Sequence, residues 1–307
     1  MLYRGIYIVA NDRVLENSIA LLNSIRHHNP EISVILIPFN QEYEQVFHTL
    51  NQFYQVELFP NLEFLEDLTQ TIGSIFDQNF LKLPNKMRKL AVWFGPLTEF
   101  LYIDTDIIVF EDIGKNLNYL SEFDFFCCDY HYLNEQLKNI FSPDIREKDI
   151  FTDRDLQDVF NSGFWGSKTG IFTEKKLYEV LRECARHREY FDFSRGVTDQ
   201  PILNYLVLKL LPKRANLVKL QRDSPGSWAG TPHFRAQDFI LYDGDQPLKY
   251  LHWAGIPLEK SAYYQLWQYY RYWRDPRTQW QRKLNQLLPF LYPEPGVYSQ
   301  KKVEDRE

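Results

Sequence analysis

The sequence has few cysteines and no spacing that would pair them. Its three cysteines are Cys127, Cys128 and Cys184, of which two are adjacent, and none belongs to a CxxC pair. A zinc site or a dithiol redox site usually needs such pairs. We therefore expect three buried thiols that act as small apolar side chains in a reducing compartment.

Excess positive charge is also missing. The 41 acidic residues outnumber the 35 lysines and arginines, which gives a formal net charge of -6. A protein organised around nucleic-acid phosphates normally carries the opposite sign. We expect a small or neutral ligand and no nucleic-acid partner.

Long apolar runs are absent as well. No stretch approaches the roughly 18 uncharged apolar residues that a membrane-spanning helix needs. Residues 1–12, MLYRGIYIVAND, lack the apolar core and small-residue cleavage site of a secretory signal. We expect a cytoplasmic protein and leave open a peripheral contact at the inner face of a membrane.

What the sequence does contain is apolar material for a sizeable core, since 44% of its residues are hydrophobic and 16% are aromatic. Its first sixty residues alternate between short β-branched runs and segments with a helical apolar stripe. The runs are 5–10, 32–39 and 54–59, and the striped segments are 15–25 and 42–51. This β-α-β-α-β order predicts an α/β fold with a mostly parallel, Rossmann-like central sheet and helices on both faces.

The first turn of that sheet has no GxGxxG sequence, so a dinucleotide fingerprint is missing. The turn instead holds Ala10, Asn11 and Asp12. Because open α/β sheets bind ligands beyond the carboxyl ends of their strands, we expect these three residues to line a ligand site.

Two carboxylates interrupt an otherwise apolar run, FLYIDTDIIVF at 100–110, where Asp104 and Asp106 flank Thr105. We expect a buried strand with Asp104 at its carboxyl end and both acids on the same side, because side chains of a strand alternate. Like charges in an apolar setting need compensation, which a divalent cation with oxygen ligands provides. The alternative is a strand end whose two carboxylates are solvated or cap nearby N–H groups.

A second alternative is the haloacid dehalogenase type of phosphatase, whose nucleophile also lies in a DxD sequence after an apolar strand. In that class the motif normally ends the first strand of the domain. Here a complete β-α-β-α-β unit precedes it, and Lys249 stands where a later acidic partner would be wanted. The phosphatase alternative is therefore disfavoured.

The later part of the chain divides by composition. Residues 1–258 form one domain, within which the polar segment 134–158 is expected to be a mobile flap of loops or small helices. Aromatic residues alternate with arginine and lysine in 259–293, which predicts a helical appendage, and 294–307 is a polar tail. The aromatics of the appendage either pack on the core or contact a membrane surface.

Several short motifs occur in a fixed order along residues 5–255. They are VAND at the end of the first strand, RKLAVW (Arg88–Trp93), LYIDTDIIV, FNSG (Phe160–Gly163), DQ (Asp199 and Gln200) and HWAG, which begins at His252. In this order and spacing the chain resembles the retaining glycosyltransferases of family 8, the glycogenin and lipopolysaccharide galactosyltransferase group, which have the GT-A fold. The resemblance implies transfer of a sugar from a nucleoside diphosphate sugar, most simply a UDP-sugar, with retention of configuration.

The resemblance also implies a metal site. Asp104, Asp106 and His252 would hold Mn²⁺ or Mg²⁺, and an imidazole among carboxylates favours Mn²⁺. Lys89, or its neighbour Arg88, would reach the donor beside the metal. The ordinary interpretation of His252 is a packed, hydrogen-bonded histidine, and that of Lys89 and Arg88 is an exposed helix face.

Other positions would surround the donor. Asn161, Ser162 and Gly163 correspond to a segment where backbone approaches the donor or acceptor sugar, and Gly255 ends the histidine motif. Asp199 and Gln200 would face the transferred sugar, with Asp199 orienting it electrostatically, although an aspartate at a helix start is also a sensible cap. The acceptor is an unknown sugar, lipid-linked or protein group.

Two departures from the family pattern concern the donor. Val14 stands where an aromatic often stacks on uracil, and Lys260 lies five residues after Gly255 instead of three. These differences leave the base and a pyrophosphate contact by Lys260 open. They also leave open a catalytically silent protein that binds a nucleotide sugar without transferring it.

Overall fold

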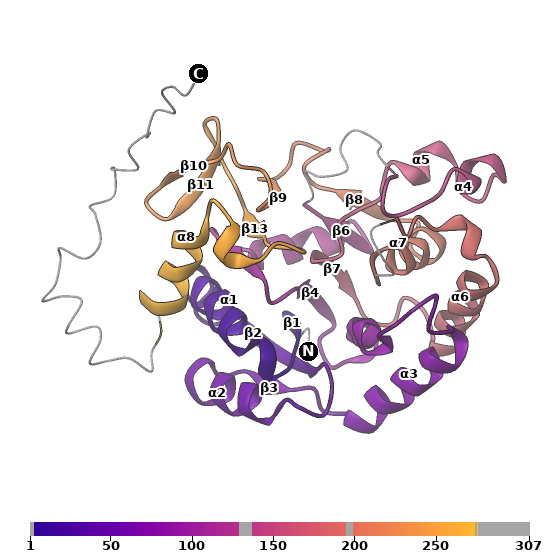
Figure 1. Cartoon of the computed structure of the whole chain (residues 1–307), viewed down its shortest axis with the longest axis horizontal. Helices are drawn as coiled ribbons and strands as arrows, with labels where there is room; N and C mark the ends of the chain where they lie inside the picture. Colours follow the sequence, from indigo (N-terminus) through magenta and orange to yellow (C-terminus); the bar gives the residue numbers. More distant parts are fainter. Residues whose placement is uncertain (1–2, 129–136, 195–198, 274, 276–307) are drawn as a thin grey trace, which may run out of the picture.

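A seven-stranded sheet forms the centre of the molecule (Figure 1), in the order β3-β2-β1-β4-β7-β6-β8. The computed structural model of the chain describes residues 3–128, 137–194, 199–273 and 275. All neighbouring strands are parallel except where β7 pairs with β4 and β6. The strands are β3 (Glu57–Leu58), β2 (Ser33–Pro38), β1 (Arg4–Ala10), β4 (Glu99–Ile103), β7 (Phe164–Lys168), β6 (Phe125–Cys127) and β8 (Arg214–Asn216).

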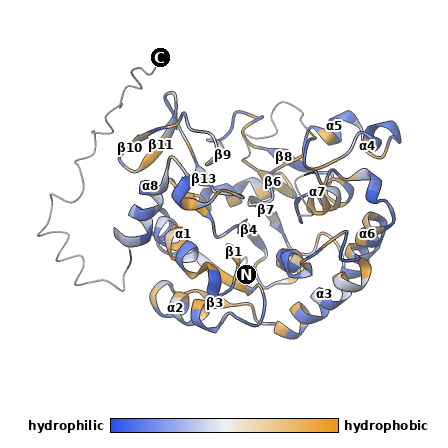
Figure 2. Ribbon diagram, viewed as in Figure 1, coloured by the Kyte–Doolittle hydropathy of each residue, from blue (hydrophilic) through white to orange (hydrophobic). Residues whose placement is uncertain are grey.

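Helices cover both faces of this sheet, as the strand alternation requires. Tyr7 and Tyr102 point into one apolar cluster and Ile6 and Leu101 into another, so successive residues of β1 and β4 are buried on opposite faces. The first cluster lies under α3 (Leu62–Ile75), η2 (Pro84–Phe94), α6 (Glu174–Arg186) and α7 (Asp199–Leu210), and the second lies under α1 (Leu15–His28) and α2 (Glu44–Tyr54). Apolar and polar residues alternate around α3 and α6 (Figure 2), as in helices with one buried side.

The predicted α/β class and mostly parallel sheet are confirmed, but the strand expected over 100–110 is wrong in one respect. The chain leaves the central sheet after Ile103, turns through residues 104–106, and enters a second sheet as β5 (Ile107–Val109). Asp104 and Asp106 therefore lie on a turn between two sheets and not on one face of a continuous strand. Aspartate is unfavourable inside a strand, which agrees with a break at this point.

The second sheet brings the far end of the chain back to this turn. It is ordered β5-β13-β9, with β13 (Tyr250–His252) antiparallel to β5 and parallel to β9 (Gly226–Trp228). A third sheet is ordered β10-β11-β12, from β10 (Arg235–Gln237), β11 (Ile240–Asp243) and β12 (Gln246–Pro247). Besides η2, the described residues form four further 3₁₀ segments at separate places along the chain: η1 (Asp12–Val14), η3 (Gly114–Ser121), η4 (Arg188–Tyr190) and η5 (Leu258–Lys260).

The described part of the segment expected to be a mobile flap packs into the core. It contains the small helices α4 (Asp144–Glu147) and α5 (Asp153–Leu156), which the sequence allowed for. Ile140, Phe141 and Leu156 are buried in the first apolar cluster. Residues 134–136 of the segment lie outside the described residues. The flap interpretation is wrong for 137–158, because its apolar side chains anchor it.

The described part of the C-terminal appendage also packs on the core. Helix α8 (Tyr264–Gln268) continues into the π-helical η6 (Tyr269–Trp273), and Trp267 and Tyr270 are buried. The Asn23 amide on α1 donates to the carbonyl of Tyr270 at 2.7 Å. Core packing is thus confirmed up to Tyr270, while residues 276–307 lie outside the described residues.

Two further expectations concern cysteines and membranes. Cys127, Cys128 and Cys184 are all buried and none forms a disulfide, as predicted. Within the described ranges, every helix is too short or too polar to cross a bilayer.

Candidate metal and donor site

The predicted site residues meet where β4 ends and the chain turns toward β5. In the β13–β5 pairing His252 lies opposite Ile107, and the backbone N–H of Trp253 donates to the carbonyl of Asp106 at 3.0 Å. On the other side, the N–H of Asp104 donates to the carbonyl of Gly163 at 2.8 Å. Strand register alone therefore brings three distant parts of the sequence to one point.

The side chains of Asp104, Asp106 and His252 form a compact cluster. Nε2 of His252 lies 3.1 Å from Oδ1 of Asp106 and 3.8 Å from Oδ2 of Asp104. One oxygen or nitrogen from each residue lies within 4.8 Å of the others. Two carboxylates and an imidazole are a donor set that suits Mn²⁺. The residues present therefore fit a divalent cation.

Gly163 makes this cluster sterically feasible. A Cβ atom there would lie 2.7 Å from Nδ1 of His252, closer still to Cε1, and 3.1 Å from Oδ2 of Asp104. Real Cβ atoms essentially never lie closer than 3.0 Å to such atoms, so the imidazole can take this position only because residue 163 has no side chain. Gly163, which the sequence placed beside the sugar, is thus needed for the close packing of His252 and Asp104.

The ionisation of the cluster reflects mutual attraction. Burial alone raises the pKa of Asp106, but the adjacent His252 outweighs burial and brings the pKa below its ordinary value. Conversely, burial lowers the pKa of His252, while Asp106 and Asp104 raise it and prevail. The two carboxylates therefore stabilise a positive charge between them, on the imidazole or on a bound cation.

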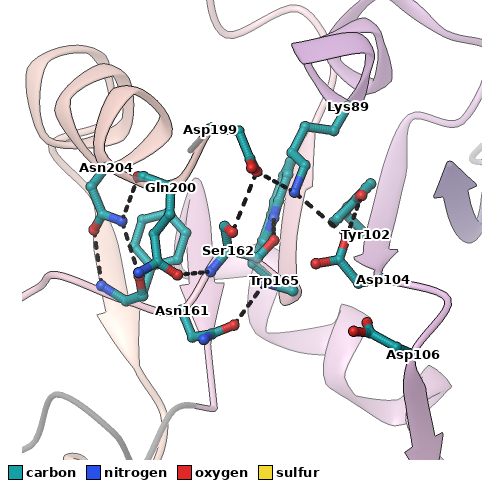
Figure 3. Close-up of polar contacts among 12 residues, drawn as sticks. Lys89, Tyr102, Asp104, Asp106, Asn161, Ser162, Trp165, Asp199, Gln200 and Asn204 are labelled. Atoms are coloured by element: carbon teal, nitrogen blue, oxygen red, sulfur yellow. Dashed lines mark hydrogen bonds and ion pairs between the residues drawn. The ribbon is translucent and has the colours of Figure 1, made fainter. Parts of the chain in front are cut away.

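Lys89 lies between two acids of the site. Its ammonium is 2.6 Å from Oδ2 of Asp199 and 3.5 Å from Oδ1 of Asp104, and its side chain is 7% exposed. Figure 3 shows the lysine reaching between the two carboxylates. Burial lowers the pKa of Lys89, but Asp104 and Asp199 outweigh burial and raise it above its ordinary value. Burial raises the pKa of Asp199, but Lys89 outweighs burial and lowers it below its ordinary value. One buried cation therefore links Asp199 to the candidate metal cluster.

The DQ and FNSG motifs are hydrogen-bonded to each other. Oε1 of Gln200 accepts the backbone N–H of Ser162 at 3.1 Å, and the hydroxyl of Ser162 is 3.5 Å from Oδ2 of Asp199. Asp199 begins α7, yet its carboxylate turns toward Lys89 and Ser162. The start of α7 and the loop before β7 therefore form one wall of the site.

Two residues that the sequence did not single out support this arrangement. Asn204 is fully buried on α7, where its side chain bonds both the N–H and the C=O of Phe160 at 2.9 Å. Tyr102 donates its hydroxyl to Oδ1 of Asp104 at 2.6 Å. Burial and the adjacent Asp104 raise the pKa of Tyr102, which keeps the hydroxyl protonated. The spacing of Tyr102 two residues before Asp104 was a usable signal, because side chains two residues apart in extended backbone point to the same side, and Asp104 directly follows the end of β4.

Arg88 has different partners from its neighbour Lys89. Its guanidinium contacts the hydroxyl of Thr69, the carbonyl of Pro38 and the carboxylate of Glu66 at 2.5–2.9 Å. These partners hold a buried cation at the carboxyl end of β2. The structure therefore does not unite Arg88 with the Asp104 cluster, and the idea that it replaces Lys89 gains no support.

The remaining predicted positions lie at turns. Ala10 ends β1 and Asn11 follows it, both buried, while Asp12 accepts the N–H of Val46 at 2.8 Å and so supports the start of α2. Thr105 lies on the turn between the two acids and not on the strand that the sequence predicted. Gly255 has φ +70 with open space on its side-chain face, a conformation that favours glycine. Donor contacts by these residues stay predictions.

Comparison with known proteins identifies the fold. No protein-family model matches the chain, and no curated protein matches it. A solved galactosyltransferase, LgtC in complex with donor and acceptor sugar analogs, is similar with a TM-score of 0.54 at 12% identity, covering 91% of this chain and 99% of LgtC. The bifunctional glycosyltransferase WbbM gives 0.53 at 14% identity, covering 93% of this chain. GlyE from Streptococcus pneumoniae TIGR4 gives 0.50 at 13% identity, covering 97% of this chain and 66% of GlyE.

These similarities show a shared architecture. This chain spans about half of WbbM, since the match covers 51% of that protein. It has the GT-A fold of the LgtC-like structures, as the sequence resemblance implied. The identities are too low to carry activity or substrate from those proteins to this one.

Proposed function

We propose that this chain is a metal-dependent glycosyltransferase that moves a sugar from a nucleoside diphosphate sugar, with UDP as the first candidate, to an acceptor with retention of configuration. The observation that carries the proposal is the cluster of Asp104, Asp106 and His252 at the carboxyl end of β4. This is the edge at which open α/β sheets bind ligands. The GT-A fold supports the same choice over a phosphatase-type hydrolase.

In this proposal the three clustered side chains hold Mn²⁺ or Mg²⁺. When bound, the cation neutralises negative charge on the departing nucleoside diphosphate. The chain's own cation, Lys89, adds a fixed positive charge 3.5 Å from Asp104 without reorganisation during the reaction. A buried, fixed charge is worth more than a solvated one, so Lys89 contributes to leaving-group stabilisation.

Asp199 and Gln200 are proposed to orient the transferred sugar. The ion pair with Lys89 keeps the Asp199 carboxylate ionised, as its lowered pKa indicates. An ionised carboxylate accepts hydrogen bonds from sugar hydroxyls and stabilises positive charge on the sugar ring. The contact of Gln200 with the N–H of Ser162 keeps the sugar-facing wall in place.

The acceptor is proposed to be a sugar, lipid-linked or protein group. Contacts to it are proposed to come from 134–158 and from the C-terminal appendage. The described part of that appendage is packed on α1 through Tyr270. We also propose a cytoplasmic location, because the three buried cysteines form no disulfide.

A thermal-shift panel tests the function. The chain is heated with UDP-, GDP-, ADP- and CDP-sugars, each with and without Mn²⁺, and the best donor is then followed for sugar transfer and for release of free sugar. We expect one class of donor to stabilise the protein only with Mn²⁺, and Asp104→Ala and Asp106→Ala to abolish that response. Stabilisation that needs no metal and survives both substitutions would contradict the proposal.

The alternatives predict different products. A phosphatase-type hydrolase would release inorganic phosphate from simple phosphate esters without any sugar acceptor. A silent binding protein would respond to donor and metal in the panel but would neither transfer nor hydrolyse the sugar. A transfer assay needs a known acceptor, whereas hydrolysis of the donor needs only water. Release of free sugar from the donor therefore shows catalytic activity even when no acceptor is supplied.

A further inference from the structure

Two side chains outside the candidate ligand set touch the ligands themselves. Tyr102 donates its hydroxyl to Oδ1 of Asp104 at 2.6 Å. Oδ1 of Asn161 lies 3.2 Å from Nδ1 of His252. Each contact is made to an atom other than the one that lies near another candidate ligand, which is Oδ2 in Asp104 and Nε2 in His252.

The orientation of the Asn161 amide is fixed by the backbone. Its Oδ1 also accepts the N–H of Gly163 at 3.0 Å. A backbone N–H can only donate, so the atom facing it must be the amide oxygen and not the amide nitrogen. The same oxygen then requires a hydrogen on Nδ1 of His252.

A hydrogen on Nδ1 determines what the other ring nitrogen can do. In the neutral imidazole only one nitrogen carries hydrogen, so Nε2 is left with its lone pair. Nε2 lies 3.1 Å from Oδ1 of Asp106 and 3.8 Å from Oδ2 of Asp104, so without a cation it also carries a hydrogen, which it donates to Asp106. A bound cation would take the place of that hydrogen, while the hydrogen on Nδ1 stays with Asn161. Asn161 thus prepares the tautomer in which Nε2 can bind a cation.

The two oxygens of Asp104 are distinguished in the same way. Oδ1 is occupied by the hydroxyl of Tyr102 and lies 3.5 Å from the ammonium of Lys89. Oδ2 is the oxygen that faces His252. Because Oδ1 already accepts two donors, Oδ2 is the atom available to a cation.

Both supporting side chains are held by rigid surroundings. The Tyr102 ring stacks on Trp165, with ring centroids 5.2 Å apart and planes 24° apart. Asn161 lies in the loop that Asn204 and Gln200 bind from α7. Neither side chain can turn away without breaking further contacts.

We propose that Tyr102 and Asn161 are positioning residues that select Oδ2 of Asp104 and Nε2 of His252 as the atoms presented to the divalent cation. The inference rests on the proposed metal site and adds to it the second layer of residues that orients the ligands. Such outer contacts typically change metal affinity by about 10–100-fold. For Asn161 this role differs from the sugar contact that the sequence resemblance implied.

The Asn161 part is tested by the tautomer and by Mn²⁺ binding. Nitrogen-15 NMR of the full chain saturated with Mg²⁺, a diamagnetic cation, should show His252 with hydrogen on Nδ1 and none on Nε2, its signal being identified by loss in His252→Ala. Asn161→Leu should allow the Nε2–H form and weaken Mn²⁺ binding about tenfold or more. Asn161→Asp keeps an acceptor oxygen and should bind Mn²⁺ at least as tightly as the wild type.

The overturning results are equally definite. A Mg²⁺-saturated wild type in which His252 has hydrogen on Nε2 and none on Nδ1 contradicts the inference directly. So does equal Mn²⁺ affinity in the wild type and Asn161→Leu. If Asn161→Leu and Asn161→Asp were weakened alike, the amide would matter for loop structure and not for its acceptor oxygen.

The Tyr102 part has a matched control in the same protein. Tyr205 is also fully buried and donates to a carboxylate, Oε1 of Glu183, at 2.6 Å, but Glu183 is not a candidate ligand. Tyr102→Phe should weaken Mn²⁺ binding about tenfold or more, whereas Tyr205→Phe should leave it unchanged. Equal Mn²⁺ affinities in the two variants would overturn the role of Tyr102.

Failure of this inference can be told from failure of the proposed function. If the wild type binds Mn²⁺ and the variants bind it equally well, only the positioning role is wrong. If the wild type binds no Mn²⁺, alone or with UDP, the metal site is wrong and both fall. Electron paramagnetic resonance of free Mn²⁺ measures all of these affinities without reference to catalytic activity.

Discussion

Nε2 of His252 lies 3.1 Å from Oδ1 of Asp106, although the two residues are far apart in the sequence. The pairing of β13 with β5 produces this contact, since His252 is opposite Ile107, the residue after Asp106. The central sheet ends just before, at Ile103. The candidate metal site therefore lies at the junction between two sheets.

Removing the charge of Lys89 should destabilise the protein. Lys89→Met leaves the carboxylates of Asp104 and Asp199 without their shared cation, at a cost up to the roughly 3–5 kcal/mol typical of a broken buried pair. Adding Asp199→Asn in the same chain should recover part of that loss, because one uncompensated charge is removed. Urea denaturation measures both effects, and strictly additive losses would argue against the ion pair.

Asp199→Asn alone should separate metal binding from transfer. Asp199 lies outside the candidate ligand set, so Mn²⁺ affinity should stay near the wild-type value. Loss of the charge that we propose to face the transferred sugar should lower the transfer rate by about 100-fold or more. A variant with full turnover would show that the Asp199 charge has no essential part.

Gly163→Ala should damage the site more than the fold. The added methyl group would lie 2.7 Å from Nδ1 of His252 and 3.1 Å from Oδ2 of Asp104, so one or both side chains must move. We expect a loss of about 1–3 kcal/mol in stability from overpacking, together with strongly weakened Mn²⁺ binding. Gly73→Ala is a useful control, because a Cβ atom there would meet only Cγ of Pro84 at an ordinary contact distance of 3.6 Å. Normal metal binding by Gly163→Ala would contradict the packing.

The Glu183 carboxylate should make stability depend on pH. Burial raises its pKa, but Tyr205 and Lys209 outweigh burial and lower the pKa below its ordinary value. Such a group stabilises the fold above the unfolded pKa and loses that contribution as pH falls through the folded pKa. Tyr205→Phe should therefore cost about 1–2 kcal/mol near pH 7, with a difference from the wild type that shrinks below about pH 4. A difference that stays constant in acid would rule out this linkage.

The sequence was sufficient for the α/β class because β1 and β2 are apolar runs and α1 carries a helical stripe. The order of the motifs also predicted that Asp104 and His252 share one site, but no local pattern in the sequence did. Periodicity treats 100–110 as one strand, because the apolar residues on both sides of the two acids are alike. Which sheet Ile107 joins depends on β13, far along the chain, and local pattern contains no such information.

The supporting residues were harder to predict for a related reason. Asn204 resembles any polar residue in a helix until its contacts with Phe160 are known. Arg88 and Lys89 are adjacent and similarly charged, yet their side chains find different partners, because consecutive residues of a helix point in different directions around its axis. Composition does not show which of the two faces the site. Side-chain direction at a site is a tertiary property, and tertiary contacts determine it.

The central claim is that Asp104, Asp106 and His252 hold a divalent cation on which donor binding depends. The most direct test is a calorimetric titration of UDP into the full chain with Mn²⁺ and again with a chelator. A bound cation contributes several kcal/mol to holding a diphosphate, so we predict affinity at least about 100-fold higher with Mn²⁺, and loss of that gain in Asp106→Ala. UDP binding of equal strength in Mn²⁺ and in chelator, unchanged by Asp106→Ala, would contradict the account.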